Sequence, residues 1–178
     1  DYLVTEVFVP EHRCFGLFTR EPLRGASPLF RMGLMPVTAA GHGAWALGVA
    51  KSMLDDVAEL AQTKARMSDM ETLARRNTFQ RNLAHFTGMW RAARAGMIET
   101  FVGVEEAVAS GQSLTPTMRA DMRVAATYAT EASREVGQWA HLAAGTSAIR
   151  NGSRLERAFR DLYTGTQHAF ISEKTYID

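Results

Sequence analysis

The chain has 178 residues, of which 46% are hydrophobic and 22% are charged, so it can bury a sizeable core in one domain. The formal net charge of +1, with no long basic run, gives no reason to expect nucleic acid or an anionic membrane as a partner. Cys14 is the only cysteine, which excludes an internal disulfide and fits the reducing cytoplasm, and no apolar run approaches the length that spans a bilayer.

The N-terminal residues 2–9 are rich in β-branched and aromatic types and stop at Pro10, which predicts one β-strand. A single strand does not stay folded without a partner. Since the chain also begins at Asp1, inside this strand, we expect it to be a fragment of a larger protein. Prolines and glycines then predict a linker that reaches about Leu34.

The spacing of apolar residues predicts a first helix from Pro36 to about Lys64. Gly41, Gly43 and Gly48 thin one face of this helix. That face could accept either a closely packed helix or a flat ligand.

A second helix follows a capping box at residues 68–71 and ends by Gly111. Its apolar residues recur every three or four positions, which predicts one buried face. This stripe consists of Phe79, Leu83, Phe86, Trp90, Ala93, Met97, Phe101, Val104 and Val108. We expect it to be core packing and not a cofactor site.

Thr115 and Pro116 open a third helix, which Gly145 ends. A capping box at residues 153–156 opens a short helix to residue 162 or 163, and a last helical piece covers about 166–176. These elements predict an all-α, antiparallel, up-and-down four-helix bundle with a short N-terminal strand or extended segment and a short C-terminal helix. The long helices also suggest an oligomer interface.

The sequence contains no metal-binding pattern. Bundles often hold metals through Glu-x-x-His pairs, and no such pair occurs here. His42, His85 and His141 lie on three different helices without acidic partners at helical spacing. We therefore expect no metal, and the residues alone predict only an oligomeric helical bundle.

The order of four short motifs resembles the acyl-CoA dehydrogenase superfamily over essentially the whole chain. A strand ending in Val9-Pro10 leads into helices there, and Gly48-Val49-Ala50 resembles the family's Gly-x-Ala step. Arg76-Asn77-Thr78-Phe79 resembles its Arg-x-x-Phe entry to the second long helix, although Gln80 replaces the family's glycine. Leu155-Glu156-Arg157 with Arg160-Asp161 resembles its Leu-x-Arg-x-x-Arg-Asp stretch.

The resemblance implies that residues 1–34 are the end of a β-domain strand and a linker, and that 35–178 are the C-terminal helical bundle of a flavoprotein. It implies a homotetramer, a dimer of dimers, with FAD or FMN between the β-domain and the bundle and contacts from a second subunit. The fragment alone would not retain the flavin, because most of the isoalloxazine pocket would be missing.

Positions that match the family's flavin contacts are Arg76 and the turn Gly145-Thr146-Ser147, with Gln80 as a weaker match. A guanidinium suits a pyrophosphate, and a helix-end turn with free N–H groups and two hydroxyls can hold one too. Gly145 could equally be a plain helix C-cap, and Arg76 and Gln80 could be solvated side chains.

The stretch from Arg160 to His168 separates two branches of the superfamily. Acyl-CoA dehydrogenases carry a Glu base after Arg-Asp, whereas residues 163–168 here read Tyr-Thr-Gly-Thr-Gln-His and contain no carboxylate. Asp161-x6-His168 instead resembles the flavin-dependent monooxygenase branch. There His168 would lie near the flavin as the catalytic hydrogen-bonding and proton-transfer residue. Arg160 and Asp161 would fix the loop.

The leading prediction is therefore a monooxygenase or hydroxylase that uses O2 and reduced flavin, supplied by a separate flavin reductase, on an aromatic or similar small substrate. One alternative is an acyl-CoA dehydrogenase with a displaced base. The other is a non-catalytic helical oligomerisation module.

Overall fold

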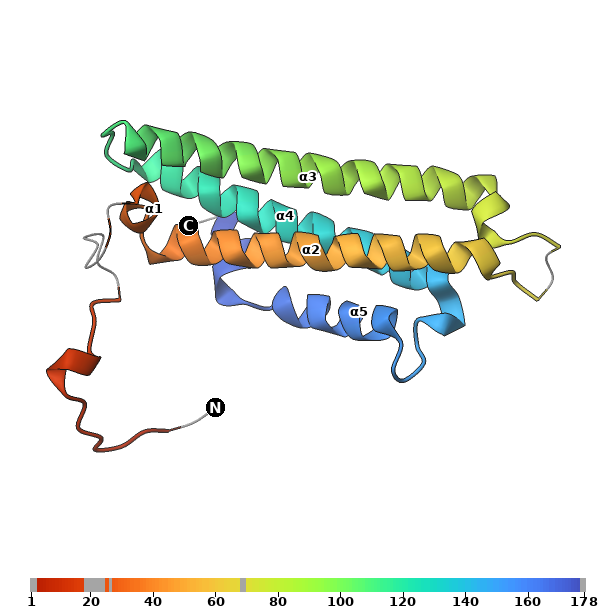
Figure 1. Ribbon diagram of the computed structural model, residues 1–178, viewed down its shortest axis with the longest axis horizontal. Coiled ribbons are helices and arrows are strands. Elements are labelled where there is room, and N and C mark those ends of the chain that lie inside the picture. Colours follow the sequence, from red (N-terminus) through yellow and green to blue (C-terminus); the bar gives the residue numbers. More distant parts are fainter. Residues whose placement is uncertain (1–2, 18–24, 26, 68–69, 177–178) are drawn as a thin grey trace.

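The computed structural model describes residues 3–17, 25, 27–67 and 70–176, and helices dominate it (Figure 1). The helices are α1 (Pro28–Arg31), α2 (Leu34–Thr63), α3 (Asn77–Ala109), α4 (Pro116–Ala144) and α5 (Arg154–Gly165). From α2 to α5, each helix runs back along the one before it after a short connection. The prediction of an all-α, up-and-down antiparallel bundle is confirmed.

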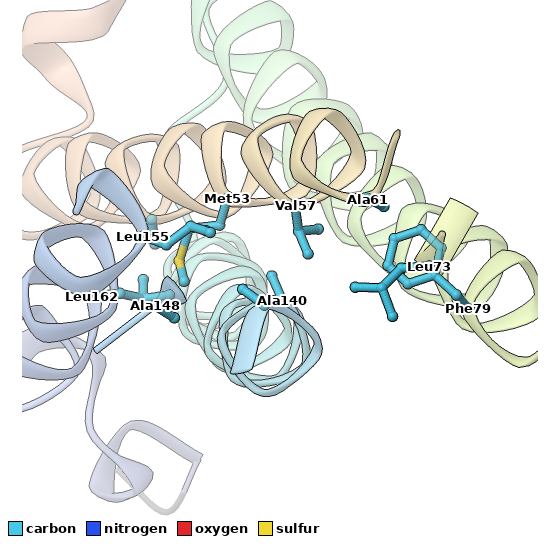
Figure 2. Close-up of a cluster of buried hydrophobic side chains, with 11 residues drawn as sticks. Met53, Val57, Ala61, Leu73, Phe79, Ala140, Ala148, Leu155 and Leu162 are labelled. Carbon is cyan, nitrogen blue, oxygen red and sulfur yellow. The ribbon is translucent and has the colours of Figure 1, made fainter. Parts of the chain in front are cut away.

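Helix α4 is the centre of the bundle, because it packs against α2, α3 and α5 (Figure 1). Small side chains on its buried face, including Ala126, Ala129 and Ala140, let its neighbours approach closely. At Gly137, a Cβ atom would lie 2.6 Å from Cδ2 of Leu162 on α5, so α5 packs closely against α4 here. Figure 2 shows the main apolar cluster, in which α2, α4 and α5 meet the α3 entry.

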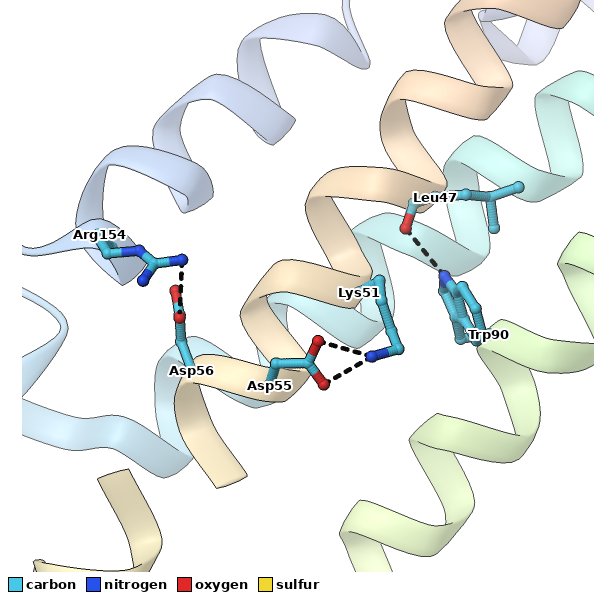
Figure 3. A network of polar contacts seen from close by, with 6 residues as sticks. All are labelled: Leu47, Lys51, Asp55, Asp56, Trp90 and Arg154. Carbon is cyan, nitrogen blue, oxygen red and sulfur yellow. Dashed lines mark hydrogen bonds and ion pairs between the residues drawn. The ribbon is translucent and has the colours of Figure 1, made fainter. Parts of the chain in front are cut away.

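The predicted apolar stripe on α3 forms the contact of this helix with the rest of the bundle. Its buried members are Phe79, Ala93, Met97, Val104 and Val108, and its other four residues are partly buried against the core clusters. The Nε1–H group of Trp90 also donates a hydrogen bond of 2.9 Å to the Leu47 carbonyl on α2 (Figure 3). The prediction of a structural stripe is confirmed.

An ion pair fastens the first turn of α5 to α2. Arg154 Nη2 lies 3.2 Å from Asp56 Oδ1, as Figure 3 shows. Burial raises the pKa of the Asp56 carboxyl group, while the Arg154 guanidinium acts in the opposite direction. The Asp56 carboxylate is therefore less solvated than an ordinary surface carboxylate.

The predicted N-terminal strand is not confirmed. Residues 3–9 have no strand pairing, and Leu3 and Phe8 expose 88% and 87% of their surface. Among the described residues, the only β-bridge is an isolated one between Ala65 and Thr72. A strand needs a neighbouring strand to satisfy its backbone groups, and the part of the chain that the structure describes offers none to residues 3–9.

The predicted start of α4 is confirmed, whereas α3 begins later than predicted. Thr115 caps α4 as predicted, because its side chain accepts a hydrogen bond of 3.1 Å from Met118 N. Helix α3 begins at Asn77, later than predicted, after a 3-10 turn at Leu73–Arg75; two residues of its expected capping box, 68 and 69, lie outside the described residues.

The expected capping box at the start of α5 does not form, and the C-terminal helical piece is divided in two. Ser153 makes no side-chain cap hydrogen bond, and Glu156 pairs with Arg160. Residues 166–176 contain two 3-10 turns, Ala169–Ile171 and Glu173–Tyr176, in place of one helical piece. Helix nucleation is costly, and a segment of about ten residues forms too few further hydrogen bonds to offset it, so tertiary contacts decide its shape.

None of the helices in the described ranges is both long and apolar enough to cross a membrane.

Candidate functional site

His168 follows the C-terminal end of α5, in a turn that reverses the chain. Helix α5 extends to Gly165, and the backbone N–H groups of Thr166, Gln167 and His168 donate back to carbonyls of its last turn. The His168 ring is exposed, and its Nδ1 atom accepts a hydrogen bond of 3.3 Å from Phe170 N. In a neutral imidazole this leaves the proton on Nε2, so His168 presents a hydrogen-bond donor to its surroundings.

Two side chains of α2 pack against this turn. His42 Nε2 lies 2.9 Å from the Gly165 carbonyl oxygen, and the His42 and His168 ring centroids lie 5.0 Å apart. The Trp45 ring centroid lies 5.4 Å from that of His42. We call His42, Trp45, Gly165 and His168 the imidazole end of the bundle.

Arg160 and Asp161 do not pair with each other, although they are neighbours in sequence. Arg160 forms a two-point ion pair with Glu156, and Asp161 lies 3.6 Å from Arg157. The Glu156 carboxylate raises the pKa of the Arg160 guanidinium, chiefly through this hydrogen bond. Both residues thus make helix-surface contacts along α5, which leaves His168 as the group of this stretch that is available for chemistry.

The Gly145-Thr146-Ser147 turn lies at the C-terminal end of α4, and Lys64 reaches it from the end of α2. Gly145 has a φ of +54°, so glycine serves here as the helix C-cap. Lys64 Nζ donates to the Ala144 carbonyl at 2.5 Å and to Ser147 Oγ at 2.8 Å. Burial lowers the pKa of Lys64, with further lowering by Arg150 and Arg66, which shows that positive charges gather here.

Arg76 lies next to the same place, at the entry to α3. It lines a pocket of about 240 Å³ together with Arg66, Thr78, Asn82 and Trp139. Gln80 is exposed, and its amide donates to the Ala74 carbonyl at 2.8 Å, so it braces the 3-10 turn before α3. We call Lys64, Arg66, Arg76 and the Gly145–Ser147 turn the cationic end.

The two ends are far apart along the bundle. His42 is in the third turn of α2 and Lys64 caps its C-terminus, so the helical rise separates them by about 33 Å. Figure 1 shows the same separation, with the last turn of α5 and the α4–α5 connection toward opposite ends of the molecule. The predicted site residues therefore form two groups and not one.

The donor groups of the two ends fit different parts of a flavin cofactor. The cationic end offers guanidinium, ammonium and hydroxyl groups beside the indole of Trp139, a set that suits a phosphate-bearing chain. The imidazole end offers aromatic rings and few polar groups, which suits a planar ring system. Neither group alone offers donors for both parts of such a cofactor.

Four contributors to these two ends were missed from the sequence. His42 and Trp45 are three residues apart, a spacing that places them on one helix face, and this was the available signal. Lys64 and Arg66 lie at a helix end, where a basic residue commonly meets exposed carbonyls. In the ranges that the structure describes, no group of three His, Cys, Asp or Glu side chains could hold a metal ion.

The up-and-down bundle with these two ends can be compared with known protein families. Residues 40–173 match the family model described as acyl-CoA dehydrogenase, C-terminal domain. The chain belongs to this family.

Two curated relatives and a solved structure show where in this family the similarity lies. The chain is 28% identical to an indole-3-acetate monooxygenase of Pseudomonas putida and 26% identical to one of Acinetobacter baumannii, over 99% and 98% of its own length. It spans under half of those relatives, 45% and 44%. XiaF from Streptomyces sp., solved in complex with FADH2 and glycerol, shares the fold with a TM-score of 0.83 at 23% identity, over 96% of this chain and 46% of that one.

Proposed function

We propose that the chain is the C-terminal helical part of a flavin-dependent monooxygenase that hydroxylates a small aromatic substrate with O2. The observation that carries this proposal is the anchored turn at the imidazole end. It presents His168 and no carboxylate among residues 163–168, where thioester dehydrogenation would need a base. The names of the curated relatives, both indole-3-acetate monooxygenases, support the same reaction and an indole-type substrate.

Residues 35–178 would then be the bundle domain, and residues 1–34 would be the end of a β-domain strand with its linker. Exposed apolar side chains at Leu3, Val7 and Phe8 support this division, because they would be covered by the rest of a β-domain. Most of the isoalloxazine pocket would be formed by that β-domain, so the fragment alone would not retain flavin. A purified chain that is yellow with stoichiometric flavin would contradict this.

When bound, reduced FAD or FMN from a cytoplasmic reductase partner supplies the two electrons that activate O2. The chain's own residues would act around this chemistry. His168 would donate a hydrogen bond from Nε2 and move a proton, and the Tyr163–His168 turn would help to exclude water. Arg76 and Ser147 would hold phosphate oxygens through charged and hydroxyl donors.

The separation of the two ends supports a flavin site shared between subunits of a homo-oligomer, for which we propose a dimer of dimers. About 33 Å is too long for one flavin ring and its adjoining phosphates to meet both groups of one chain, so one flavin would use the imidazole end of one subunit and the cationic end of another. A groove of about 670 Å³ between α3 and α4 supports such an assembly. It is lined by Gly96, Gly103, Val124 and Tyr128, and a Cβ atom at either glycine would meet nothing within 4 Å.

The test of the reaction uses the full-length protein with reduced flavin, isotopically labelled O2 and a panel that contains indole-3-acetate and phenols. We expect one labelled oxygen atom in the product, and His168→Ala should lower product formed per flavin oxidised by at least about 100-fold, the usual worth of a general acid. Unchanged product yield in His168→Ala would overturn the role of His168.

The acyl-CoA dehydrogenase alternative has one observation in its favour besides the family. Glu131 lines a pocket of about 370 Å³ with Thr166 and Gln167, so a carboxylate does approach the turn from α4. However, Glu131 accepts a hydrogen bond of 2.8 Å from the Tyr176 hydroxyl, and burial together with this bond raises the pKa of Tyr176. Anaerobic reduction of the oxidised holoenzyme by an acyl-CoA, lost in Glu131→Gln, would establish this alternative.

A further inference from the structure

The Gly165 carbonyl oxygen is shared by two histidines. It accepts a hydrogen bond of 3.1 Å from the backbone N–H of His168 and lies 2.9 Å from Nε2 of His42. Because a carbonyl can only accept, Nε2 of His42 must carry the proton of this bond. One oxygen at the last turn of α5 therefore joins the half-buried His42 side chain to the backbone of His168.

Packing fixes the same point of the chain. A Cβ atom at Gly165 would lie 2.2 Å from Cη2 and Cζ3 of Trp45, so the indole occupies the space that any larger residue would need. The end of α5 rests on this ring, while His42, three residues earlier on the same helix, supplies the hydrogen bond. The anchor thus combines one polar and one steric contact from a single face of α2.

The contacts at this anchor also limit the orientation of the His168 ring. The two imidazole centroids are 5.0 Å apart with an angle of 36° between the rings, and Nδ1 of His168 is taken by Phe170 N. With one face beside His42 and one nitrogen engaged, the free Nε2 atom has little freedom to turn. A displacement of the Gly165 carbonyl would move the backbone on which this ring is mounted.

We infer that His42 is a positioning residue for the proposed oxygenation: through the Gly165 carbonyl, it holds the turn that aims the His168 imidazole at its target. This rests on the proposed function of His168, but the anchor itself is a property of the protein without flavin. His42 touches neither substrate nor cofactor in this role.

Hydrogen exchange of the flavin-free full-length protein tests the anchor directly. His42→Leu keeps bulk and removes the donor, whereas His42→Gln keeps an N–H at nearly the same place. We expect exchange at the His168, Phe170 and Ile171 amides to become about fivefold faster in His42→Leu, the effect of losing one hydrogen bond, and to return toward the wild-type rate in His42→Gln.

His85→Leu is the matched control, because His85 is an exposed helix histidine whose ring contacts Phe86 and no part of the turn. It should leave exchange at 168–171 unchanged. Equal exchange in wild type and His42→Leu would overturn the inference, as would failure of His42→Gln to restore protection.

The holoenzyme supplies the second measurement. In His42→Leu, product formed per flavin oxidised should fall about tenfold, and the flavin oxidised without product should be accounted for by H2O2. His42→Gln should give an intermediate product yield. Faster exchange with unchanged product yield would overturn the positioning role while leaving the anchor intact. If wild type forms no product from O2, the proposed function fails, and the exchange result still decides the anchor.

Discussion

The two ends of this bundle share α2 but are completed by different helices and carry different side chains. The end of α5 supplies Gly165 and His168 at one end, and the α3 entry and the end of α4 supply Arg76 and the Gly145–Ser147 turn at the other. At the imidazole end, α2 gives His42 and Trp45, and His42 holds the turn through one carbonyl. At the cationic end, the termini of α2, α3 and α4 bring together Lys64, Arg66 and Arg76. The difference shows that this domain keeps a histidine-anchored turn and a cluster of positive charges about 33 Å apart along α2.

The largest expected effect that distinguishes the ends is on flavin affinity. Arg76→Ala in the full-length protein should raise the flavin Kd roughly 10- to 100-fold, because a charge-assisted hydrogen bond to phosphate is lost, with product per bound flavin unchanged. His168→Ala should instead leave the flavin Kd unchanged and lower the product formed per bound flavin. Titration of the apoprotein with flavin measures the Kd, and a product assay at saturating flavin measures the second quantity.

The control for Arg76→Ala is Arg81→Ala, which removes an exposed arginine one turn further along α3 that bonds to Asn82. It should leave the Kd unchanged. Equal weakening by the two variants would mean that general positive charge, and not the pocket of Arg76, attracts the cofactor.

A second, smaller effect should be confined to the imidazole end. Gly165→Ala should lower the free energy of unfolding by about 1–3 kcal/mol, because its Cβ would overlap the Trp45 indole. Trp45→Ala should relieve this, so the double variant should lose less than the sum of the single variants in denaturant titrations. Additive losses would show that the indole does not set the glycine requirement.

The smallest effect concerns pH at the cationic end. The pKa of Lys64 is lower in the folded protein than in the unfolded chain. At pH values between the folded and the unfolded pKa, the unfolded chain therefore binds more protons than the folded protein. Stability from this group is therefore absent at low pH and rises as pH increases through this interval. Lys64→Met should flatten the rise in Tm that the wild type shows in alkaline buffer; an identical pH profile would contradict the shift.

Much of the fold could be predicted from sequence because it depends on local periodicity. The α3 stripe from Phe79 to Val108 has one partner surface, so spacing alone identified its buried face. The Thr115 cap likewise depends on neighbours only three residues away. Residues 166–176 were misjudged, because their 3-10 turns follow contacts with α2 and α4 and not their own propensity.

The site was harder to predict for the same reason. His42 acts on Gly165, 123 residues away, and Lys64 on Ser147, 83 residues away, and nothing local in the sequence signals either contact. The resemblance to a family found His168, Arg76 and the Gly145 turn as separate motifs. It did not show that they lie at opposite ends of α2, which only the packed helices determine.

The central claim is that each flavin uses the imidazole end of one subunit and the cationic end of another, and mixed assemblies test it most directly. His168→Ala and Arg76→Ala subunits of the full-length protein should each be impaired alone. Mixed by co-expression, a hybrid dimer should contain one site with both native residues, so monooxygenase activity should recover. Activity no higher than the average of the two parent variants would contradict the claim.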